Sequence, residues 1–180
     1  MQRCGWCNER NAAYVQYHDS EWCVPSVDDR YLFEMLVLES FQAGLSWECI
    51  LNKRNAFREA YDNFDIDKVS AYGEDDIARL MGNTGIVRNR RKIAASISNA
   101  RIFKEIVKKH GSFYSYLTSF TEGRTLYEVG LVKNGLSDRI SADLQKRGMK
   151  FVGSVITYSY LQAIGIIYSH EEGCFLYGQK

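Results

Sequence analysis

The 180-residue sequence has one proline, Pro25, five cysteines and no long apolar run. A membrane-spanning helix needs about 20 consecutive apolar residues, and a secretory signal peptide needs an apolar segment near its start. Neither pattern occurs, so we expect a cytoplasmic protein with reduced cysteines and no membrane partner. Repeats, low-complexity tracts and long linkers are also missing. With 46% hydrophobic residues the chain can bury one core, and we expect a single domain over residues 1–180.

Sustained alternation of apolar and polar residues, which marks half-buried strands, is missing as well. Apolar residues recur instead at helical spacing, as in Leu32, Phe33 and Leu36. We therefore expect an all-α fold, with the apolar final helix at its centre. The expected helices cover residues 29–40, Ser46 to Phe57, 66–71, a segment opening at Glu74, 89–109, Ser137 or Asp138 to Gly148, and Ser154 to Tyr168.

The net charge is only +1, but it is unevenly distributed along the chain. Residues 1–80 hold 8 Lys/Arg and 15 Asp/Glu, a net charge of −7, whereas residues 81–180 hold 15 and 7, a net charge of +8. We interpret the basic run as a face for a polyanion, and a solvated helix face is the alternative. The run consists of Arg88, Arg90, Arg91 and Lys92, followed by Arg101, Lys104, Lys108 and Lys109.

Soft metal ligands are concentrated at both ends of the chain. His170 and Cys174 lie near the C-terminus, and further cysteines lie near the N-terminus. Zinc favours thiolate and imidazole in a tetrahedral site, so this placement predicts a zinc clasp joining the termini. Spacing leaves the N-terminal ligands open among Cys4, Cys7, Cys23 and His18.

The spacing of Cys4 and Cys7 also matches a redox dithiol. Such a motif follows a strand, and only three residues precede Cys4. Cys23 and Cys49 have apolar neighbours, as small buried cysteines do. A zinc-dependent or redox enzyme is the alternative to a closed structural site, and it would need an open metal position or a reactive thiol pair.

Residues 76–93 have the pattern helix, glycine-bearing turn, helix, and the second helix begins in the basic run. This layout is typical of a helix-hairpin-helix. Gly85 would let the turn reach positive φ, leaving N–H groups at the next helix start free to bind a phosphate. Such contacts position a protein on DNA without reading sequence. An ordinary helical hairpin is one alternative, and a noncatalytic DNA-binding module is another.

Aromatic residues crowd the N-terminal part of the chain, namely Trp6, Tyr14, Tyr17, Trp22 and Trp47. Their faces can stack on a flat base, especially a cationic one, although core packing is their commoner use. Glu39 favours the binding interpretation. It ends an apolar helical stretch, where burying an unpaired carboxylate costs free energy. A carboxylate at such a position therefore indicates a function such as ligand binding.

Six short strings occur in order over nearly the whole chain. They are Arg-Cys-Gly-Trp (3–6), Tyr-His-Asp-Ser-Glu-Trp (17–22), Gln-Ala-Gly-Leu-Ser-Trp (42–47), Gly-Ile-Val-Arg-Asn (85–89), Lys-Arg-Gly-Met-Lys-Phe-Val-Gly (146–153) and His-x3-Cys (170–174). Together they resemble the bacterial 3-methyladenine DNA glycosylase I family, which belongs to the helix-hairpin-helix glycosylases and carries a structural zinc. The resemblance implies a monofunctional enzyme that flips out and hydrolytically excises 3-methyladenine from alkylated double-stranded DNA, leaving an abasic site.

Residue by residue, the resemblance implies a role for each matching position. Residues 1–23 and 168–176 would form the clasp, with zinc on Cys4, His18, His170 and Cys174 rather than Cys7. The base pocket would consist of the catalytic Glu39 with Tyr14, Tyr17, Trp22, Trp47 and Trp6. DNA contacts would come from Gly44, Leu45, Gly85, Ile86, Val87 and Arg88. The resemblance implies no protein partner, and a monomer is the default expectation.

The chain departs from the family pattern at two places. Cys23 stands where the family usually has glycine, and Ser40 and Phe41 stand where small or polar residues are usual. The family also lacks the aspartate and the lysine nucleophile that other glycosylases of this superfold use. We therefore expect the DNA strand to stay uncut. The departures at Cys23, Ser40 and Phe41 leave Glu39 in place, so we expect them to affect substrate preference more than activity.

Overall fold

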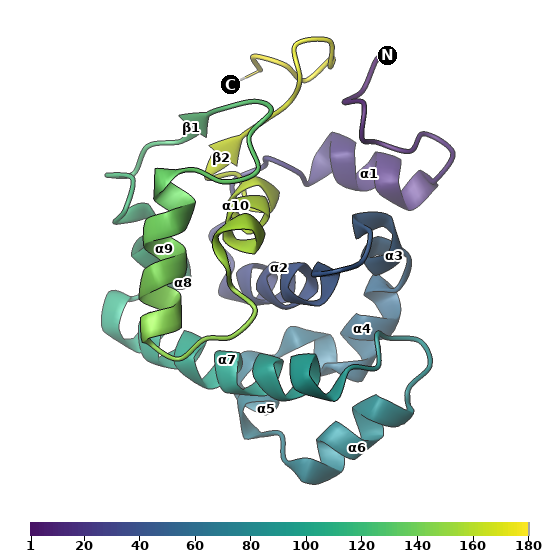
Figure 1. Ribbon diagram of the computed structural model, residues 1–180, viewed down its shortest axis with the longest axis vertical. Coiled ribbons are helices and arrows are strands. Elements are labelled where there is room, and N and C mark those ends of the chain that lie inside the picture. The colour runs from purple at the N-terminus through teal and green to yellow at the C-terminus, as the bar shows by residue number, and fades with distance from the viewer. Residues whose placement is uncertain (180) are drawn as a thin grey trace.

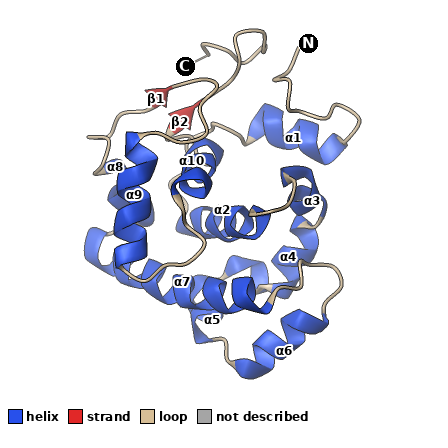
Figure 2. Ribbon diagram, in the orientation of Figure 1, coloured by secondary structure: helices blue, strands red, loops and turns tan. Residues whose placement is uncertain are grey.

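The computed structural model describes residues 1–179, which are mostly helical (Figures 1 and 2). Lys180, the last residue of the expected single domain, lies outside this range. The elements in chain order are α1 (Ala12–Ser20), α2 (Asp29–Gln42), α3 (Trp47–Asn52), α4 (Arg54–Ala60), η1 (Asp62–Phe64), α5 (Ile66–Ala71), α6 (Glu74–Gly82), α7 (Arg90–His110), α8 (Phe113–Thr118), β1 (Leu126–Tyr127), α9 (Gly135–Lys146), α10 (Ser154–Ala163) and β2 (Ile167–Tyr168). Within residues 1–179, every helix is too short or too polar to cross a bilayer.

Helix α2 lies at the centre of the fold, with α3, α7, α8 and α10 packed around it (Figure 1). Every residue from Leu32 to Phe41 is buried, and burial of each large apolar side chain contributes about 1.5–3 kcal/mol. Polar groups in such a helix need partners or a function. Ser40 donates to the carbonyl of Leu36 at 2.8 Å, and Glu34 accepts hydrogen bonds from arginines. Glu39 is the third polar residue of this run.

The long helix α7 packs its apolar stripe against the same core. Ile93, Ile97, Ala100, Phe103 and Ile106 are all buried, as their helical spacing predicts. The ring of Phe103 stacks on the ring of Phe113 with centroids 3.9 Å apart. This contact joins α7 to α8, a short helix that the sequence reasoning did not predict.

The two chain ends lie on the same side of the molecule (Figure 1). The amide of Phe175 donates to the carbonyl of Gln2 at 2.9 Å, and the amide of Gly5 donates to the Glu171 carboxylate at 2.6 Å. The N-terminal segment and α1 are thereby held against the last residues of the chain.

Several helix boundaries confirm the expectations. Helix α2 begins at Asp29, with the Asp28 side chain accepting from the Arg30 amide at 3.1 Å, and it continues two residues past the expected end. Helix α5 covers residues 66–71 and is capped by Asp65. Helix α6 begins at Glu74, and its first turn carries three acidic residues at the positive end of the helix dipole.

Three predicted boundaries are wrong. The helix expected from Ser46 to Phe57 is broken at Lys53 into α3 and α4. The Lys53 amide donates to Ile50, and its ammonium reaches the carbonyl of Gly85. Helix α9 begins at Gly135 rather than Ser137 or Asp138, because the Asn134 side chain caps it by accepting from the Ser137 amide at 2.8 Å.

The helix expected to run to Tyr168 ends at Ala163. Gly165 has φ +74°, and a Cβ there would lie 2.3 Å from the backbone nitrogen of Pro25, so the chain turns where it crosses an earlier segment. Ile167 and Tyr168 then pair in parallel with Leu126 and Tyr127. This two-stranded ladder is the exception to the all-α expectation within residues 1–179.

Candidate functional site

A cavity of about 370 Å³ opens between the N-terminal segment, α2, α3, α10 and the loop after β1. All five aromatic residues predicted for the pocket line it, together with Glu39. Its complete lining is Trp6, Tyr14, Tyr17, Trp22, Glu39, Gln42, Trp47, Val129, Gly130, Leu131, Val132, Ser159, Gln162, Ser169 and Glu171. The structure therefore brings together residues separated by more than 150 positions in sequence.

Helix α1 supplies one aromatic wall. The Asn11 side chain caps this helix by accepting from the amides of Ala13 and Tyr14, and Tyr14 and Tyr17, three positions apart, share one face. The Asn11 amide group also donates to Glu48 and Asn52 at 2.8 and 2.9 Å, which fastens α1 to α3. The sequence reasoning missed α1 because its apolar pattern is weak.

Aromatic rings line the rest of the cavity in tilted and edge contacts. Tyr17 and Trp47 have centroids 5.3 Å apart at an angle of 54°, and Trp6 meets Trp22 at 4.6 Å and 75°. Such geometries place the edge of one ring against the face of another. The indole Nε1 of Trp47 is buried with no hydrogen-bond partner among the described residues.

Glu39 is 4% exposed and has no hydrogen-bond or ion-pair partner among residues 1–179. Burial raises the pKa of its carboxyl from 4.5 to about 8. Glu34, one turn and a residue earlier on α2, is also buried but contacts Arg54 at 2.6 Å and Arg58 at 2.8 Å. Glu39 is thus the unpaired acid of α2, and it faces the cavity with a strong tendency to bind a cation or a donor.

The turn between α2 and α3 lies beside the cavity. Gly44 has φ +83°, which favours glycine, and the Leu45 side chain is 40% exposed. Ser46 caps α3 by accepting from the Cys49 amide at 3.2 Å. The turn therefore presents Leu45 outward while fixing the start of the helix that carries Trp47.

The segment between α6 and α7 forms the predicted hairpin turn, with Ile86 buried, Val87 half-buried and Arg88 exposed. The expected positive φ at Gly85 is wrong. Glycine is needed there for space, because a Cβ would lie 2.9 Å from the Cβ of Ala56 on α4. Asn89 caps α7 by accepting from the Lys92 amide, and the Gly85 amide donates to the Asn83 side chain at 2.8 Å within the turn.

The basic run is less exposed than the sequence suggests. Lys92 is buried, so its place in an exposed cationic face is wrong. Arg90 pairs with Glu74 at 2.5 Å, and Lys104 pairs with Asp67 at 2.6 Å. Arg88, Arg91, Lys108 and Lys109 are exposed.

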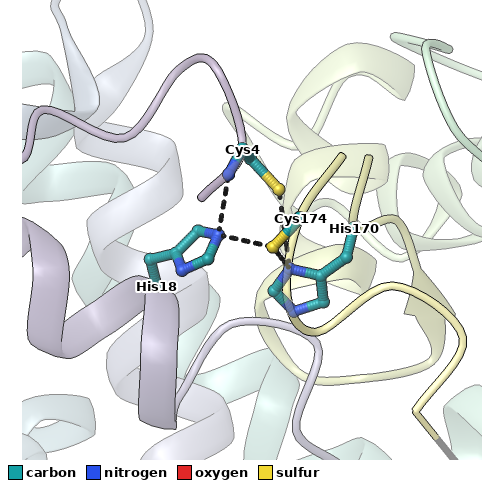
Figure 3. Close-up of side chains that lie close together, drawn as sticks. All are labelled: Cys4, His18, His170 and Cys174. Atoms are coloured by element: carbon teal, nitrogen blue, oxygen red, sulfur yellow. Dashed lines mark hydrogen bonds between the residues drawn. The ribbon is translucent and has the colours of Figure 1, made fainter. Parts of the chain in front are cut away.

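Four side chains from the two chain ends converge on one point (Figure 3). The ligand atoms of Cys4, His18, His170 and Cys174 all lie within 4.8 Å of one another, and all four residues are buried. The Cys174 sulfur lies 3.5 Å from His18 Nε2 and 3.5 Å from His170 Nδ1, and the Cys4 sulfur lies 3.5 Å from His170 Nδ1. Ligands about 2.0–2.3 Å from a tetrahedral ion have such separations, so the group could hold a metal ion.

Neighbouring residues orient these ligands. His18 Nδ1 contacts the Asp19 carboxylate at 2.8 Å, and Arg3 donates to that carboxylate at 2.7 Å. A carboxylate behind a histidine fixes the ring so that the other nitrogen faces the metal. Burial lowers the pKa of His170 to about 4, which keeps its imidazole neutral.

The remaining cysteines do not join this cluster. The Cys7 thiol lies 3.9 Å from the carbonyl of Tyr14, away from the four ligands. Cys23 has φ +65°, in the region that favours glycine, and its sulfur accepts from the Ser169 amide at 3.3 Å. That backbone conformation explains why the resemblance implies glycine at this position.

Ser40 and Phe41, the other departures, do not line the cavity. Phe41 packs in the core with its ring 4.9 Å from that of Phe57. The lining that was not predicted from the sequence comes from Gln42, residues 129–132, Ser159, Gln162, Ser169 and Glu171. Gln42 is the first residue of the string at 42–47 that resembles the family, so the sequence contained a reason to include it. The loop after β1 has no pattern that predicts its position.

Comparisons with known proteins agree with this geometry. The family model for methyladenine glycosylase matches residues 6–177. DNA-3-methyladenine glycosylase 1 of Escherichia coli K12 is 42% identical, over 98% of this chain and 97% of the relative. A crystal structure of 3-methyladenine DNA glycosylase I superposes with a TM-score of 0.92, at 42% identity over 97% of this chain and 98% of that one.

A structure describing 3-methyladenine recognition by the Staphylococcus aureus enzyme superposes with a TM-score of 0.91, at 34% identity over 97% of this chain and 95% of that one. The match thus extends over nearly the full length of relatives from different bacteria. On the sequence strings, the helical fold and this agreement, the chain belongs to the methyladenine glycosylase family.

Proposed function

We propose that this protein is a DNA glycosylase that excises 3-methyladenine from alkylated double-stranded DNA in base excision repair. Relatives and structural neighbours with this activity in their names support the proposal. The observation that carries it is the buried, unpaired carboxyl of Glu39 in a cavity walled by aromatic rings. An acid and aromatic faces together suit a flat cationic base.

The chemistry follows from the charge of the substrate. A base methylated at N3 is cationic, so its glycosidic bond is weak and the base leaves as a neutral molecule without general-acid assistance. The nucleotide must first be flipped out of the stack, which costs least for a damaged base. Water then attacks the anomeric carbon of the sugar while the glycosidic electron pair leaves with the base, and the attacking water releases its proton to solvent.

Glu39 is the catalytic residue of this proposal. Its ionised carboxylate accepts hydrogen bonds from the edge of the flipped base, while Tyr17 and Trp47 contact the ring faces. The desolvated cation–π attraction contributes about 2 kcal/mol. The cation itself lowers the pKa of Glu39 on binding, since opposite charges a few ångströms apart favour the ionised form.

The DNA backbone is held by the helix-hairpin-helix of residues 76–93. The amides of Ile86 and Val87 make no hydrogen bond within residues 1–179, and together with the exposed Arg88 beside the Gly85 turn they suit phosphate contacts. Leu45, presented by the Gly44 turn, enters the gap that the flipped nucleotide leaves. Because no nucleophilic lysine or aspartate is assigned, the strand stays uncut at the abasic site.

The four clustered ligands hold one structural zinc in this proposal. Two thiols and two imidazoles are the donor set that zinc prefers, and four protein ligands leave no open position for catalysis. When bound, the metal supplies folding free energy rather than chemistry. The clasp holds Tyr14, Tyr17 and Trp22 against the cavity, within one catalytic domain that acts as a monomer.

Release of 3-methyladenine from alkylated DNA tests the proposal. We expect the wild type to release the base and Glu39→Gln to be slower by about 10²-fold, as for loss of one preorganised electrostatic contact. Glu59→Gln, an exposed glutamate on α4, is the matched control and should keep wild-type activity. No release by the wild type would refute the function, and a fully active Glu39→Gln would refute the role of Glu39.

A further inference from the structure

Lys92 is a buried cation outside the candidate base pocket. It lies on the first turn of α7 and is 7% exposed, although lysine is rarely buried without partners. Its ammonium donates to the carbonyl of Phe41 at 2.7 Å and to the carbonyl of Ala43 at 2.6 Å. These carbonyls lie at the C-terminal end of α2, where a helix leaves oxygens free and its dipole attracts positive charge.

The turn between α2 and α3 is also held by hydrogen bonds within itself. The Gln42 side chain donates from Nε2 to the carbonyl of Leu45 at 3.1 Å, and the Leu45 amide donates to the Gln42 carbonyl at 2.7 Å. Lys92 thus fixes the beginning of the turn to α7, and Gln42 closes the turn on itself. The exposed Leu45 side chain projects from a loop that is restrained at both ends.

Helix α7 connects this tether to the hairpin. Arg88 precedes Lys92 by four residues, and Asn89 caps the helix between them. Farther along α7, Asn99 donates to the carbonyl of Lys150 at 2.9 Å and accepts from the Lys150 amide at 2.9 Å, which fixes the helix against the loop before α10. A phosphate bound at the hairpin and the Leu45 turn are therefore linked through one rigid helix.

Building on the proposed function, we propose that Lys92 is a positioning residue that couples the hairpin to the Leu45 turn. The hydrogen bonds from Lys92 to Phe41 and Ala43 fix the distance between the phosphates bound at the hairpin and the base step that Leu45 enters. Its effect is on nucleotide flipping rather than on the base pocket. Lys92 has no contact with the base or the sugar in this mechanism.

The structure separates this role from support of the pocket. Helix α3, which carries Trp47, is fastened to α1 by the hydrogen bonds from Asn11 to Glu48 and Asn52. Glu39 lies in the buried interior of α2, before the end that Lys92 caps. Trp47 and Glu39 therefore have supports that do not include Lys92.

Lys92→Met tests the coupling, because methionine keeps a similar stem and removes the ammonium. We expect kcat on alkylated DNA to fall by about 10²-fold, the usual effect of a displacement near 1 Å at a reacting group. Affinity for the free base 3-methyladenine should stay within twofold of wild type, since the pocket is intact. A 2-aminopurine beside an abasic-site analogue should show a smaller fluorescence rise on binding, because Leu45 enters the stack less often.

Arg91→Met is the matched charge-loss comparison, because Arg91 is the exposed neighbour of Lys92. If Arg91 contacts a phosphate, Arg91→Met should raise KM and reduce the magnitude of the slope of log affinity against log salt by about 0.9. The buried Lys92 should leave that slope unchanged. Lys92→Arg, which keeps the charge and the donors, should recover part of kcat.

Lys92→Gln removes the buried charge but keeps an amide donor on a shorter stem, and it decides the question if Lys92→Met does not fold. We expect a reduced 2-aminopurine signal and a lower kcat for this variant too. Wild-type kcat and fluorescence in the folded variants would overturn the proposal, as would a Lys92→Met defect that appears only in KM and the salt slope. Parallel loss of free-base binding in Lys92→Met would overturn it as well. An inactive wild type would instead refute the proposed function together with this inference.

Discussion

Replacing Glu39 by glutamine should stabilise the protein, and the gain should depend on pH. The carboxyl has a pKa of about 8 in the folded protein and 4.5 as its ordinary value. The folded state therefore keeps a proton that the unfolded chain releases above pH 4.5. Because folding binds this proton, the free energy of unfolding falls as pH rises from about 4.5 to about 8.

The size of the effect follows from the two pKa values. At 1.36 kcal/mol per pKa unit, the difference between 4.5 and about 8 corresponds to about 5 kcal/mol above pH 8. At pH 7 the folded protein is still mainly protonated, and the cost is about 3 kcal/mol. Glutamine has a similar shape and no charge, so Glu39→Gln avoids this cost at every pH.

Urea unfolding of wild type and Glu39→Gln at half-unit steps from pH 5 to pH 9 measures the difference in free energy. We expect the difference to grow through this range by several kcal/mol and to level off above pH 8. Glu59→Gln is the control for loss of an exposed carboxylate and should show a small, flat difference. A constant difference between Glu39→Gln and wild type across pH 5–9 would show that Glu39 is not buried in an unpaired state.

Three further experiments test the cavity, the ligand cluster and the packing of the α6–α7 turn. For the wild type, kcat/KM should rise with pH up to about 8, because the carboxyl of the free enzyme must ionise; stopped assays at pH 6–9 should show no such rise for Glu39→Gln. Treatment with a chelator, which would empty the proposed zinc site, and Cys174→Ser should each lower the thermal midpoint by about 10 °C, as followed by circular dichroism and metal content. Cys49→Ser should leave the midpoint unchanged. Gly85→Ala should cost about 1–3 kcal/mol in urea unfolding because its Cβ would meet Ala56, whereas Gly82→Ala, with nothing within 4 Å, should be neutral or slightly stabilising.

The sequence predicts the helices whose signals are local. Asp65 before α5 and the acids of Glu74–Asp76 are visible without knowledge of distant residues, and those boundaries are confirmed. The end of α10 depends on a crossing between Gly165 and Pro25, 140 positions apart. No property of the residues around Ala163 could reveal that crossing.

The same distinction applies to the candidate site. The cluster of four possible metal ligands takes two residues from each chain end. Spacing alone could not choose His18 over Cys7, and the family resemblance made that choice. In the sequence, Lys92 looks like part of an exposed basic run. Its burial depends on the position of the end of α2, whose carbonyls it contacts, and the residues around Lys92 do not show that position. The sequence shows which residues are charged. Only the tertiary structure shows whether a charged side chain contacts solvent, a ligand or a backbone carbonyl.

Bringing together residues from distant parts of the chain also determines when during synthesis the site can be complete. His170 and Cys174 are translated more than 150 residues after Cys4 and His18, and until they emerge Cys4 and His18 lack half of their cluster. Helix α1 and its tyrosines then have no fastening to the segment around His170. A chain interrupted before His170 would therefore have an incomplete cavity, and translation through Cys174 would be a condition for a complete site.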